Sequence, residues 1–269
     1  MSSATLLRWT GSALVPLDYC DPAEEAIEAA DSWFVTERRA LAVELHRARF
    51  ADAVLTRGFG DCDVSTFWNA AVGAIPAEGD WFPRVELVTH GGVPQFRFRH
   101  RPAPERAVSV TLATHEGRDP RTDPRVKGPD LAAMTALRTS VQRAGAHDAI
   151  LLSPEGYVVE GATTSLAWWQ DDELCVVAHE LPRIASVTER SLVALALALG
   201  VTVNEQLARP ADLDGREVWA LNALHGIRIV TNWVDGPETA QLPARLRLWR
   251  DRLSALRKPL PPRPLPLPN

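Results

Sequence analysis

The alternation of apolar and polar residues divides the first half of the chain into helices and strands. Apolar residues recur at helical spacing over 40–55, a stretch that Gly58 ends, and a second helix is predicted from Asp63 to about Ala71. The segment 6–17 is ambiguous between strand and loop, and an acidic stretch follows around 24–28. Strand-like runs cover 31–35, 85–89, 95–100 and 108–113, and Gly91-Gly92 predicts a hairpin between the second and the third.

The second half begins after a polar, proline-punctuated stretch, HEGRDPRTDPRV (115–126), in which no regular element is expected. Beyond it, Asp130 is expected to cap a helix that reaches about Ala144. A later helix is predicted over 186–199, where Gly200 ends it. The remaining strands are expected to include a four-stranded meander, and they lie at 149–152, 157–159, 166–169, 174–177, 201–203 and 218–221.

The end of the chain has two parts of different character. A basic segment, 245–258, carries leucines at helical spacing, which indicates a helix that docks through Leu246, Leu248, Leu253 and Leu256 rather than a phosphate-binding surface. The proline-rich tail from Pro259 is expected to form neither helix nor strand. These patterns predict an N-terminal α/β domain (1–116), a linker (117–126), a C-terminal domain (127–257) and a tail (258–269).

Composition narrows the class of protein. The chain has 269 residues, 46% of them hydrophobic, and a net charge of −5, which is typical of a globular protein and gives no general reason to expect nucleic acid. No apolar run is long enough to span a membrane and no secretion signal is readable, so a cytoplasmic location is expected. The three cysteines, Cys20, Cys62 and Cys175, are far apart and are expected to be reduced and structural. The seven histidines show no paired ligand spacing, so no metal site is predicted.

Lysine usage gives the first chemical hint. Almost all basic residues are arginine, and the only lysines are Lys127 and Lys258. A lysine retained in mid-chain indicates chemistry that a guanidinium cannot perform, because an amine can lose its proton and form an imine.

Three local motifs could each bind a ligand, although each also has a structural reading. Ser186-Val187-Thr188-Glu189 is a capping-box pattern whose helix start can bind an anion, but taken alone it favours simple capping. The turn that follows Glu160-Gly161 could present a carboxylate and hydroxyls, or could be only a turn. Asn222-Ala223-Leu224 ends a predicted strand, where backbone donors can cradle phosphate.

The order and spacing of these motifs resemble one known family. Lys127, AGAHDAILLSPEGYVVEGATTSL, LPRIASVTERSLVALALALG and VWALNALHGI are similar to consecutive blocks of the C-terminal domain of class IV aminotransferases, which are fold-type IV pyridoxal-phosphate enzymes. LHRARF resembles the HxxRL helix of the same family. The resemblance implies a two-domain α/β (α+β) fold with the cofactor in the cleft between the domains, a homodimer and a small-molecule substrate.

The resemblance also implies roles for individual residues. Lys127 would form the Schiff base and shuttle the proton at the substrate, while Glu160 would face the pyridine nitrogen. Phosphate would be held by Arg49, by Val187 and Thr188, and by Asn222 with the amides of Ala223 and Leu224. Thr163, Thr164 and Ser165 would line the cofactor.

Several positions depart from the family pattern. Ser186 and Glu189 replace the usual glycine and arginine at the helix start, and Phe34 stands where branched-chain aminotransferases carry an arginine for the substrate carboxylate. The Asn222-Ala223-Leu224 loop and the short chain are closer to aminodeoxychorismate lyases, in which Ser32 would lie near a substrate hydroxyl position. The resemblance therefore implies a lyase that eliminates pyruvate from 4-amino-4-deoxychorismate to give 4-aminobenzoate. Two alternatives are a class IV aminotransferase acting on an amino acid or amine, and a degenerate, non-catalytic family member.

Overall fold

The computed structural model describes residues 4–17 and 25–262, and the contacts divide the chain into two compact units. Unit 1 comprises residues 1–105, 126–129 and 257–269, and unit 2 comprises 106–125 and 130–256. In this division Val126–Pro129, with Lys127, belongs to unit 1. The domain limits expected from the sequence stay a prediction.

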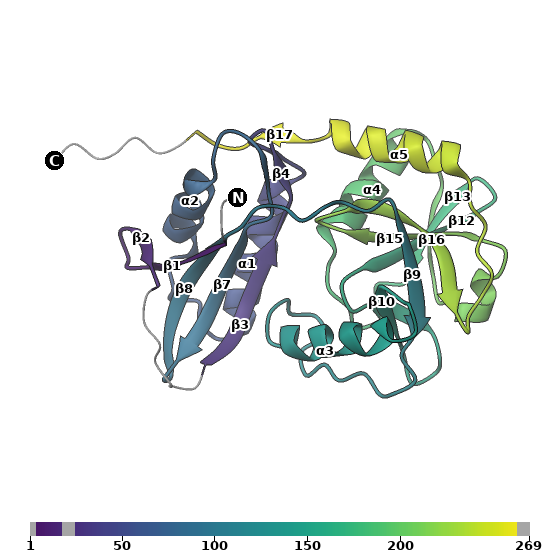
Figure 1. Ribbon diagram of the computed structural model, residues 1–269, viewed down its shortest axis with the longest axis horizontal. Helices are drawn as coiled ribbons and strands as arrows, with labels where there is room; N and C mark the ends of the chain where they lie inside the picture. Colours follow the sequence, from purple (N-terminus) through teal and green to yellow (C-terminus); the bar gives the residue numbers. More distant parts are fainter. Residues whose placement is uncertain (1–3, 18–24, 263–269) are drawn as a thin grey trace. The chain divides into compact units, whose positions relative to one another are not determined.

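Unit 1 is built on a five-stranded antiparallel sheet in the order β2-β1-β8-β7-β3 (Figure 1). Its strands are β1 (Thr5–Trp9), β2 (Leu14–Pro16), β3 (Glu25–Ser32), β7 (Arg84–His90) and β8 (Val93–His100). The hairpin predicted around Gly91-Gly92 is confirmed, since β7 pairs with β8 and both glycines have the positive φ that a tight hairpin turn needs. The acidic stretch around residue 25 begins β3. The strand expected over 31–35 is confirmed only in part, because β3 ends at Ser32 and Val35 begins a separate strand, β4 (Val35–Thr36).

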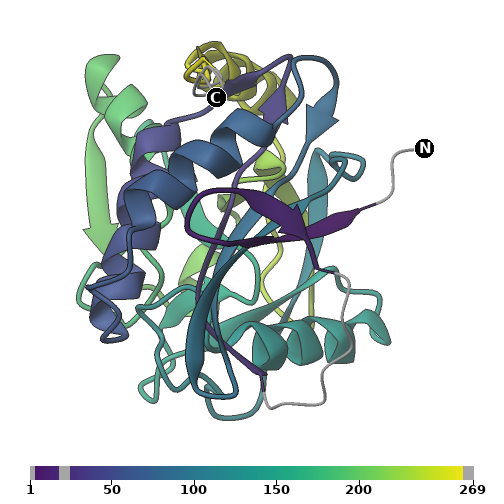
Figure 2. The same ribbon diagram turned by 90° about the vertical axis from the view of Figure 1, so that its left-hand side faces the viewer.

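Both predicted helices of unit 1 are confirmed, as α1 (Val43–Thr56) and α2 (Val64–Ala74). Asp63 caps α2 by accepting a hydrogen bond from the Thr66 amide at 3.0 Å. The two helices, seen beside the strands in Figure 2, pack apolar side chains such as Phe50 and Phe67 against Leu87 and Phe98 of the sheet.

A small second sheet in unit 1, ordered β17-β5-β4-β6, uses the end of the chain. Its strands are β4 (Val35–Thr36), β5 (Arg39–Ala40), β6 (Asp80–Trp81) and β17 (Lys258–Pro259). The expectation that the tail from Pro259 forms no strand is wrong at its first residue, because Pro259 pairs with Arg39 at the sheet edge. An edge strand tolerates a proline there, since the lost N–H is not needed by a further strand.

Unit 2 is an eight-stranded mixed sheet in the order β11-β10-β9-β16-β15-β12-β13-β14. Six of its strands match predicted runs: β9 (Ser109–Thr114), β10 (Asp148–Leu152), β11 (Val158–Gly161), β12 (Ser165–Gln170), β13 (Glu173–Val177) and β15 (Glu217–Asn222). The predicted meander is wrong, however, because β11 lies at the sheet edge while β12 pairs with β15. The strand expected at 201–203 is β14 (Val203–Gln206), and β16 (Gly226–Val234) completes the sheet.

The helices of unit 2 are α3 (Leu131–Gln142), α4 (Val187–Ala198) and α5 (Pro243–Ala255), with a short 3-10 turn η1 (Pro210–Leu213). Asp130 does not cap α3, because its carboxylate accepts hydrogen bonds from Thr122 and Asp123 of the preceding loop. Of the leucine stripe predicted on α5, Leu246 and Leu253 are buried, whereas Leu248 and Leu256 are exposed.

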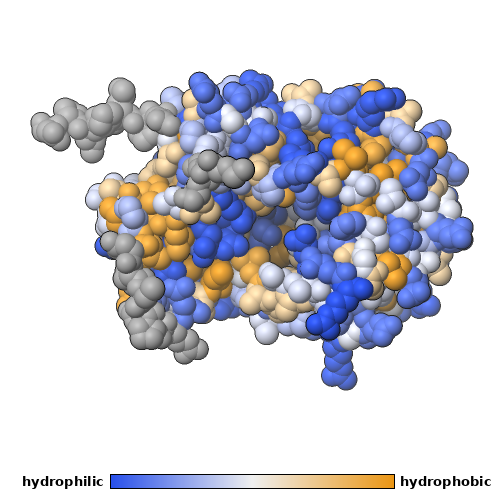
Figure 3. Space-filling model, in the orientation of Figure 1, coloured by the Kyte–Doolittle hydropathy of each residue, from blue (hydrophilic) through white to orange (hydrophobic). Residues whose placement is uncertain are grey.

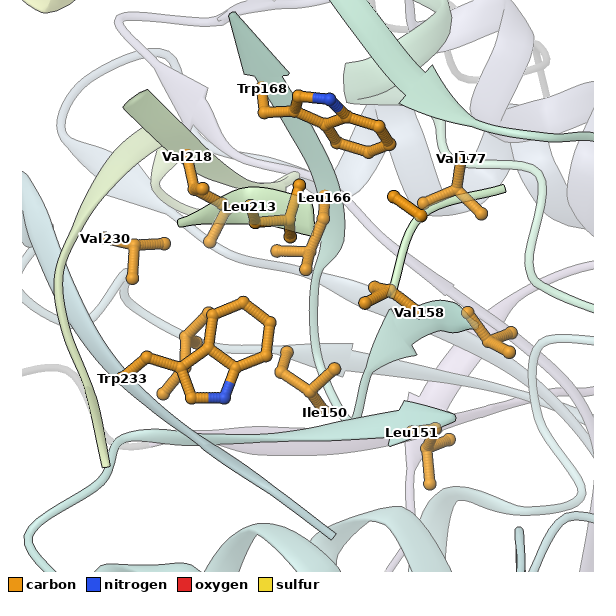
Figure 4. Close-up of a cluster of buried hydrophobic side chains, with 14 of the residues drawn as sticks. Ile150, Leu151, Val158, Leu166, Trp168, Val177, Leu213, Val218, Val230 and Trp233 are labelled. Carbon is orange, nitrogen blue, oxygen red and sulfur yellow. The ribbon is translucent and has the colours of Figure 1, made fainter. Parts of the chain in front are cut away.

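The core of unit 2 lies on one side of its curved sheet. Figure 4 shows Trp168 and Trp233 on either side of aliphatic residues that include Leu166 and Leu213, all of them buried. On the other face, Trp169 and Trp219 pack against Trp249 of α5. Cys175 is a free, buried thiol and Cys62 a free, partly buried one, while Cys20 lies outside the described residues.

The visible surface in Figure 3 mixes hydrophobic and hydrophilic side chains. Among the described residues, no helix is both long and apolar enough to cross a membrane.

Candidate active site

Strand β3 fixes the backbone around Lys127. The Ala30 amide donates a hydrogen bond to the Lys127 carbonyl oxygen at 2.7 Å. Gly128 follows with φ +151°, and a Cβ built on it would lie 2.6 Å from the Ala29 Cα. Only glycine therefore lets the chain approach β3 so closely. The predicted covalent lysine, itself partly buried, is thus tied to one strand of unit 1.

Arg49, the predicted phosphate ligand on α1, is held by the buried carboxylate of Asp31 on β3. The Arg49 Nε and Nη2 atoms each lie 2.8 Å from an Asp31 oxygen, and His46 Nδ1 lies 2.8 Å from Asp31 Oδ1. Asp31 is fully buried. Burial acts to raise the pKa of Asp31, but the neighbouring Arg49 and His46 outweigh it and hold that pKa well below its usual range.

His46 completes this cluster as a neutral side chain. Burial lowers the pKa of the His46 imidazole, although Asp31 partly opposes the shift. A neutral ring that donates from Nδ1 to the Asp31 carboxylate satisfies both groups. Neither Asp31 nor His46 was singled out from the sequence, although His46 stands three residues before Arg49, at the spacing that places both on one helix face.

Two further residues of unit 1, Ser32 and Phe34, were considered for the substrate on the basis of the sequence. Ser32, the predicted substrate contact, is a buried residue at the end of β3, and its amide donates to Asp31 Oδ1 at 2.6 Å. Phe34 is buried, and the Arg257 guanidinium lies over its ring at 5.2 Å from the centroid.

In unit 2, Glu160 forms an ion pair that the sequence did not predict. Its Oε1 atom contacts Arg121 Nη1 and accepts a hydrogen bond from the Ile184 amide at 3.0 Å. Arg121 is in turn held by Asp119 through contacts of 2.9 and 2.6 Å. Burial acts to lower the pKa of Arg121, but the two carboxylates outweigh it and raise that pKa. The only sequence signal was an arginine in a polar loop, which is too common to be informative.

The turn between β11 and β12 is organised by Asp148, a second fully buried aspartate. Its carboxylate accepts hydrogen bonds from the hydroxyls of Thr163 and Thr164, both at 2.8 Å, and from the amides of Ala149 and Thr163. A Cβ on Gly161 would lie 2.5 Å from Thr164 Oγ1, so glycine is required there. Both threonine hydroxyls of the turn thus donate to Asp148 on β10.

The start of α4 is capped as the sequence predicted, since Ser186 Oγ accepts a hydrogen bond from the Glu189 amide at 3.3 Å. The Glu189 carboxylate does not return to the cap. It forms two hydrogen bonds of 2.9 Å with Arg183, which neutralise its charge. Val187 and Thr188 are buried in the first turn, where helix amides have no intrahelical acceptor.

The loop Asn222-Ala223-Leu224 is held from both sides. Asn222 accepts a hydrogen bond from the His225 amide at 2.8 Å and donates one to the Thr163 carbonyl at 3.4 Å. Arg106 donates to the Leu224 carbonyl at 2.7 Å. In the antiparallel pairing of β12 with β15, Ser165 lies opposite Leu221. Helix α4 packs against β15. Unit 2 therefore brings together Thr163, Thr164, Ser165 and the Asn222 loop.

Comparison with known proteins identifies the family. The model of the family described as amino-transferase class IV matches residues 28–233. The chain belongs to this family. Its fold is therefore the fold-type IV α/β fold, and it is a class IV pyridoxal-phosphate-dependent aminotransferase or lyase. No curated protein matches the chain.

Solved structures agree on the fold. A fold IV-transaminase from Curtobacterium pusillum superimposes with a TM-score of 0.80 at 18% identity, covering 94% of this chain and 99% of that one. A hypothetical aminotransferase from Mycobacterium tuberculosis in its PLP-bound form gives 0.76 at 19%, covering 94% and 98%. A candidate 4-amino-4-deoxychorismate lyase from Legionella pneumophila gives 0.72 at 15%, covering 86% and 91%. At such low identity these similarities concern the fold alone.

Proposed function

We propose that this class IV enzyme binds pyridoxal phosphate and eliminates pyruvate from 4-amino-4-deoxychorismate, giving 4-aminobenzoate. The observation that favours this lyase reaction is the Asn222-Ala223-Leu224 loop, whose sequence is of the lyase type. Its asparagine is integral to the loop, because the side chain joins His225 to the turn at Thr163. A class IV aminotransferase reaction is the alternative.

The residues present fit the cofactor chemically. Phosphate is an anion, and Arg49 offers a guanidinium while the first turn of α4 offers backbone amides and the positive end of the helix dipole. Lys127 would supply the amine for covalent attachment, and Glu160 the carboxylate for the pyridine nitrogen. The amides of Ala223 and Leu224 would add further phosphate donors.

Bound pyridoxal phosphate supplies an electron sink for the carbon that carries the substrate amino group. The Lys127 amine would take the proton from that carbon, which bears no hydrogen in the aromatic product, and would pass it to the departing enolpyruvyl group. Loss of this proton allows the carbon–oxygen bond to the enolpyruvyl group to break, and the departing group becomes pyruvate once it is protonated. Ser32 would contact the substrate.

The test mixes the cofactor-loaded protein with 4-amino-4-deoxychorismate and measures pyruvate and 4-aminobenzoate. Equal amounts of both products are expected from the wild-type protein and none from Lys127→Ala. Lys258→Ala is the matched control, because it removes the only other lysine and should leave turnover unchanged. Amino donors that convert the cofactor to pyridoxamine phosphate, with no pyruvate formed, would instead establish the aminotransferase.

Covalent attachment is tested separately by borohydride reduction of the loaded protein and peptide mapping. The label should lie on the peptide that contains Lys127. A protein that binds no cofactor would favour the degenerate family member. The homodimer implied by the resemblance is also proposed, and light scattering of the loaded protein tests it.

A further inference from the structure

We propose that Asp31 is a positioning residue that holds the Arg49 guanidinium in the orientation in which it binds the phosphate of the cofactor. The affinity for a phosphorylated ligand would then depend on a residue that acts only through Arg49. This inference rests on the proposed cofactor binding and deepens it.

The first argument is the geometry of the pair. Two donors on the same edge of the guanidinium, Nε and Nη2, each contact a different oxygen of Asp31 at 2.8 Å. Two parallel hydrogen bonds fix the plane of a guanidinium as well as its position.

The second argument is that the carboxylate is itself immobile. Asp31 Oδ1 also accepts hydrogen bonds from His46 Nδ1 and from the Ser32 amide, at 2.8 and 2.6 Å. Asp31 is fully buried and its neighbour Ala30 is hydrogen-bonded to the Lys127 carbonyl. One short segment of β3 therefore holds both the backbone of Lys127 and the side chain of Arg49.

The third argument concerns energy. A buried ion pair stabilises a fold little more than apolar residues of similar volume would, because both charges lose their hydration. The strand residues next to Asp31 on this face, Ala29, Val85 and Leu87, are apolar. A charged pair in that place is better explained by the orientation it gives to Arg49 than by stability.

A purely electrostatic role predicts the opposite effect. The Asp31 carboxylate neutralises Arg49 and would repel a nearby phosphate. If this repulsion dominated, Asp31→Asn would tighten phosphate binding. If orientation dominates, as we propose, the same substitution weakens it. The sign of the change separates the two roles.

The experiment titrates the purified full-length protein with pyridoxal phosphate and with pyridoxal, which lacks the phosphate, and follows cofactor absorbance and tryptophan fluorescence. The ratio of the affinity for pyridoxal phosphate to the affinity for pyridoxal reports how much the phosphate contributes to binding. A loss of folded protein affects both affinities alike and cancels in this ratio. Asp31→Asn should lower this ratio about tenfold, the low end of what loss of an outer partner costs a ligand-binding side chain. In a protein that already carries Arg49→Met, adding Asp31→Asn should not change this ratio further.

Glu28→Gln is the matched control. Glu28 lies on the same strand, is also buried, and accepts hydrogen bonds of 3.1 and 2.8 Å from Arg57 at the end of the same helix. Its substitution should leave the affinity ratio unchanged. Should Asp31→Asn fail to fold, Asp31→Glu keeps the charge but displaces the carboxylate, and it should lower the ratio in the same direction.

An unchanged or increased ratio in the Asp31 variants would overturn the inference while leaving the proposed function intact. Wild-type protein with no preference for pyridoxal phosphate over pyridoxal would overturn both.

Discussion

Asp31 in unit 1 and Asp148 in unit 2 are both fully buried, yet their surroundings shift their pKa values in opposite directions. For Asp31, burial is outweighed by the cation Arg49 and by His46, and the pKa falls well below its usual range. For Asp148, burial prevails over hydrogen bonds from Thr164 and Thr163 and over the charge of Arg228, and the pKa rises. A directly bonded cation can offset the desolvation of a carboxylate, whereas neutral donors do so only in part.

Arg49 in unit 1 and the Thr163 turn in unit 2 are accordingly held by different means. Arg49 is held by an opposite charge, whereas the turn is held by hydrogen bonds from hydroxyl and backbone groups. Arg49 should therefore be more sensitive to the loss of its carboxylate, because the removal leaves a charge without its partner.

The largest effect is expected from Asp31→Ala. It would leave Arg49, whose side chain is only 14% exposed, without its carboxylate. Removing one member of a buried pair costs about 3–5 kcal/mol of the free energy of unfolding. Urea denaturation measures this cost. A loss below about 1 kcal/mol, the scale of an exposed pair, would contradict the description of Asp31 and Arg49 as a buried pair.

Asp148→Ala should cost less, about 1–3 kcal/mol, because it leaves hydroxyl and amide donors unsatisfied rather than a directly hydrogen-bonded cation. Asp148→Asn keeps one oxygen acceptor and should recover part of the loss. The same urea experiment measures both variants. Equal losses for the alanine and asparagine substitutions would indicate that the hydrogen bonds of the turn at Thr163 contribute little.

The dependence of stability on pH sharpens the contrast between the two aspartates. The contribution of Asp31 is present above its unfolded pKa of about 3.9 and is lost as the pH falls below it, because its folded pKa is depressed. The contribution of Asp148 is present below that value and is lost as the pH rises through its raised folded pKa. The cost of Asp31→Asn should therefore grow with pH, and the cost of Asp148→Asn should shrink. Urea unfolding of both variants at a series of pH values on either side of about 3.9 checks whether each cost rises or falls with pH.

The smallest effect concerns His225, beside the Asn222 loop. Burial, and then the charges of Arg228 and other arginines, lower the pKa of His225 to about 4. The unfolded state takes up the proton first, so stability should fall as the pH drops from about 6.5 to about 4. Because His225 is only partly buried, solvent screening limits this loss to about 1 kcal/mol.

His225→Gln should flatten the stability profile between these two pH values, which thermal or urea unfolding can follow. A slope that persists in the variant would assign the titration to another group. The Ala107 amide, which donates to His225 Nδ1 at 3.1 Å, is consistent with a ring that is unprotonated at that nitrogen.

Much of the local structure could be predicted from the order of the amino acids. Helical spacing predicted α1, α2, α4 and α5, and the glycine pair predicted the β7–β8 hairpin, because these signals depend on contacts within one element or between neighbours. The order of Lys127, Glu160, the helix start at Ser186 and the Asn222 loop was enough to indicate the family that the comparison then identified.

The partners of these residues, in contrast, become known only from the folded chain. The pairing of Arg49 with Asp31, of Glu160 with Arg121 and of the Thr163 turn with Asp148 joins residues 15 to 39 positions apart. The separation of β11 from β12 likewise depends on β15 and β16, which come later in the chain. Periodicity and turn residues carry no information about such contacts, since a charged residue has many possible partners along the chain and only folding selects one of them.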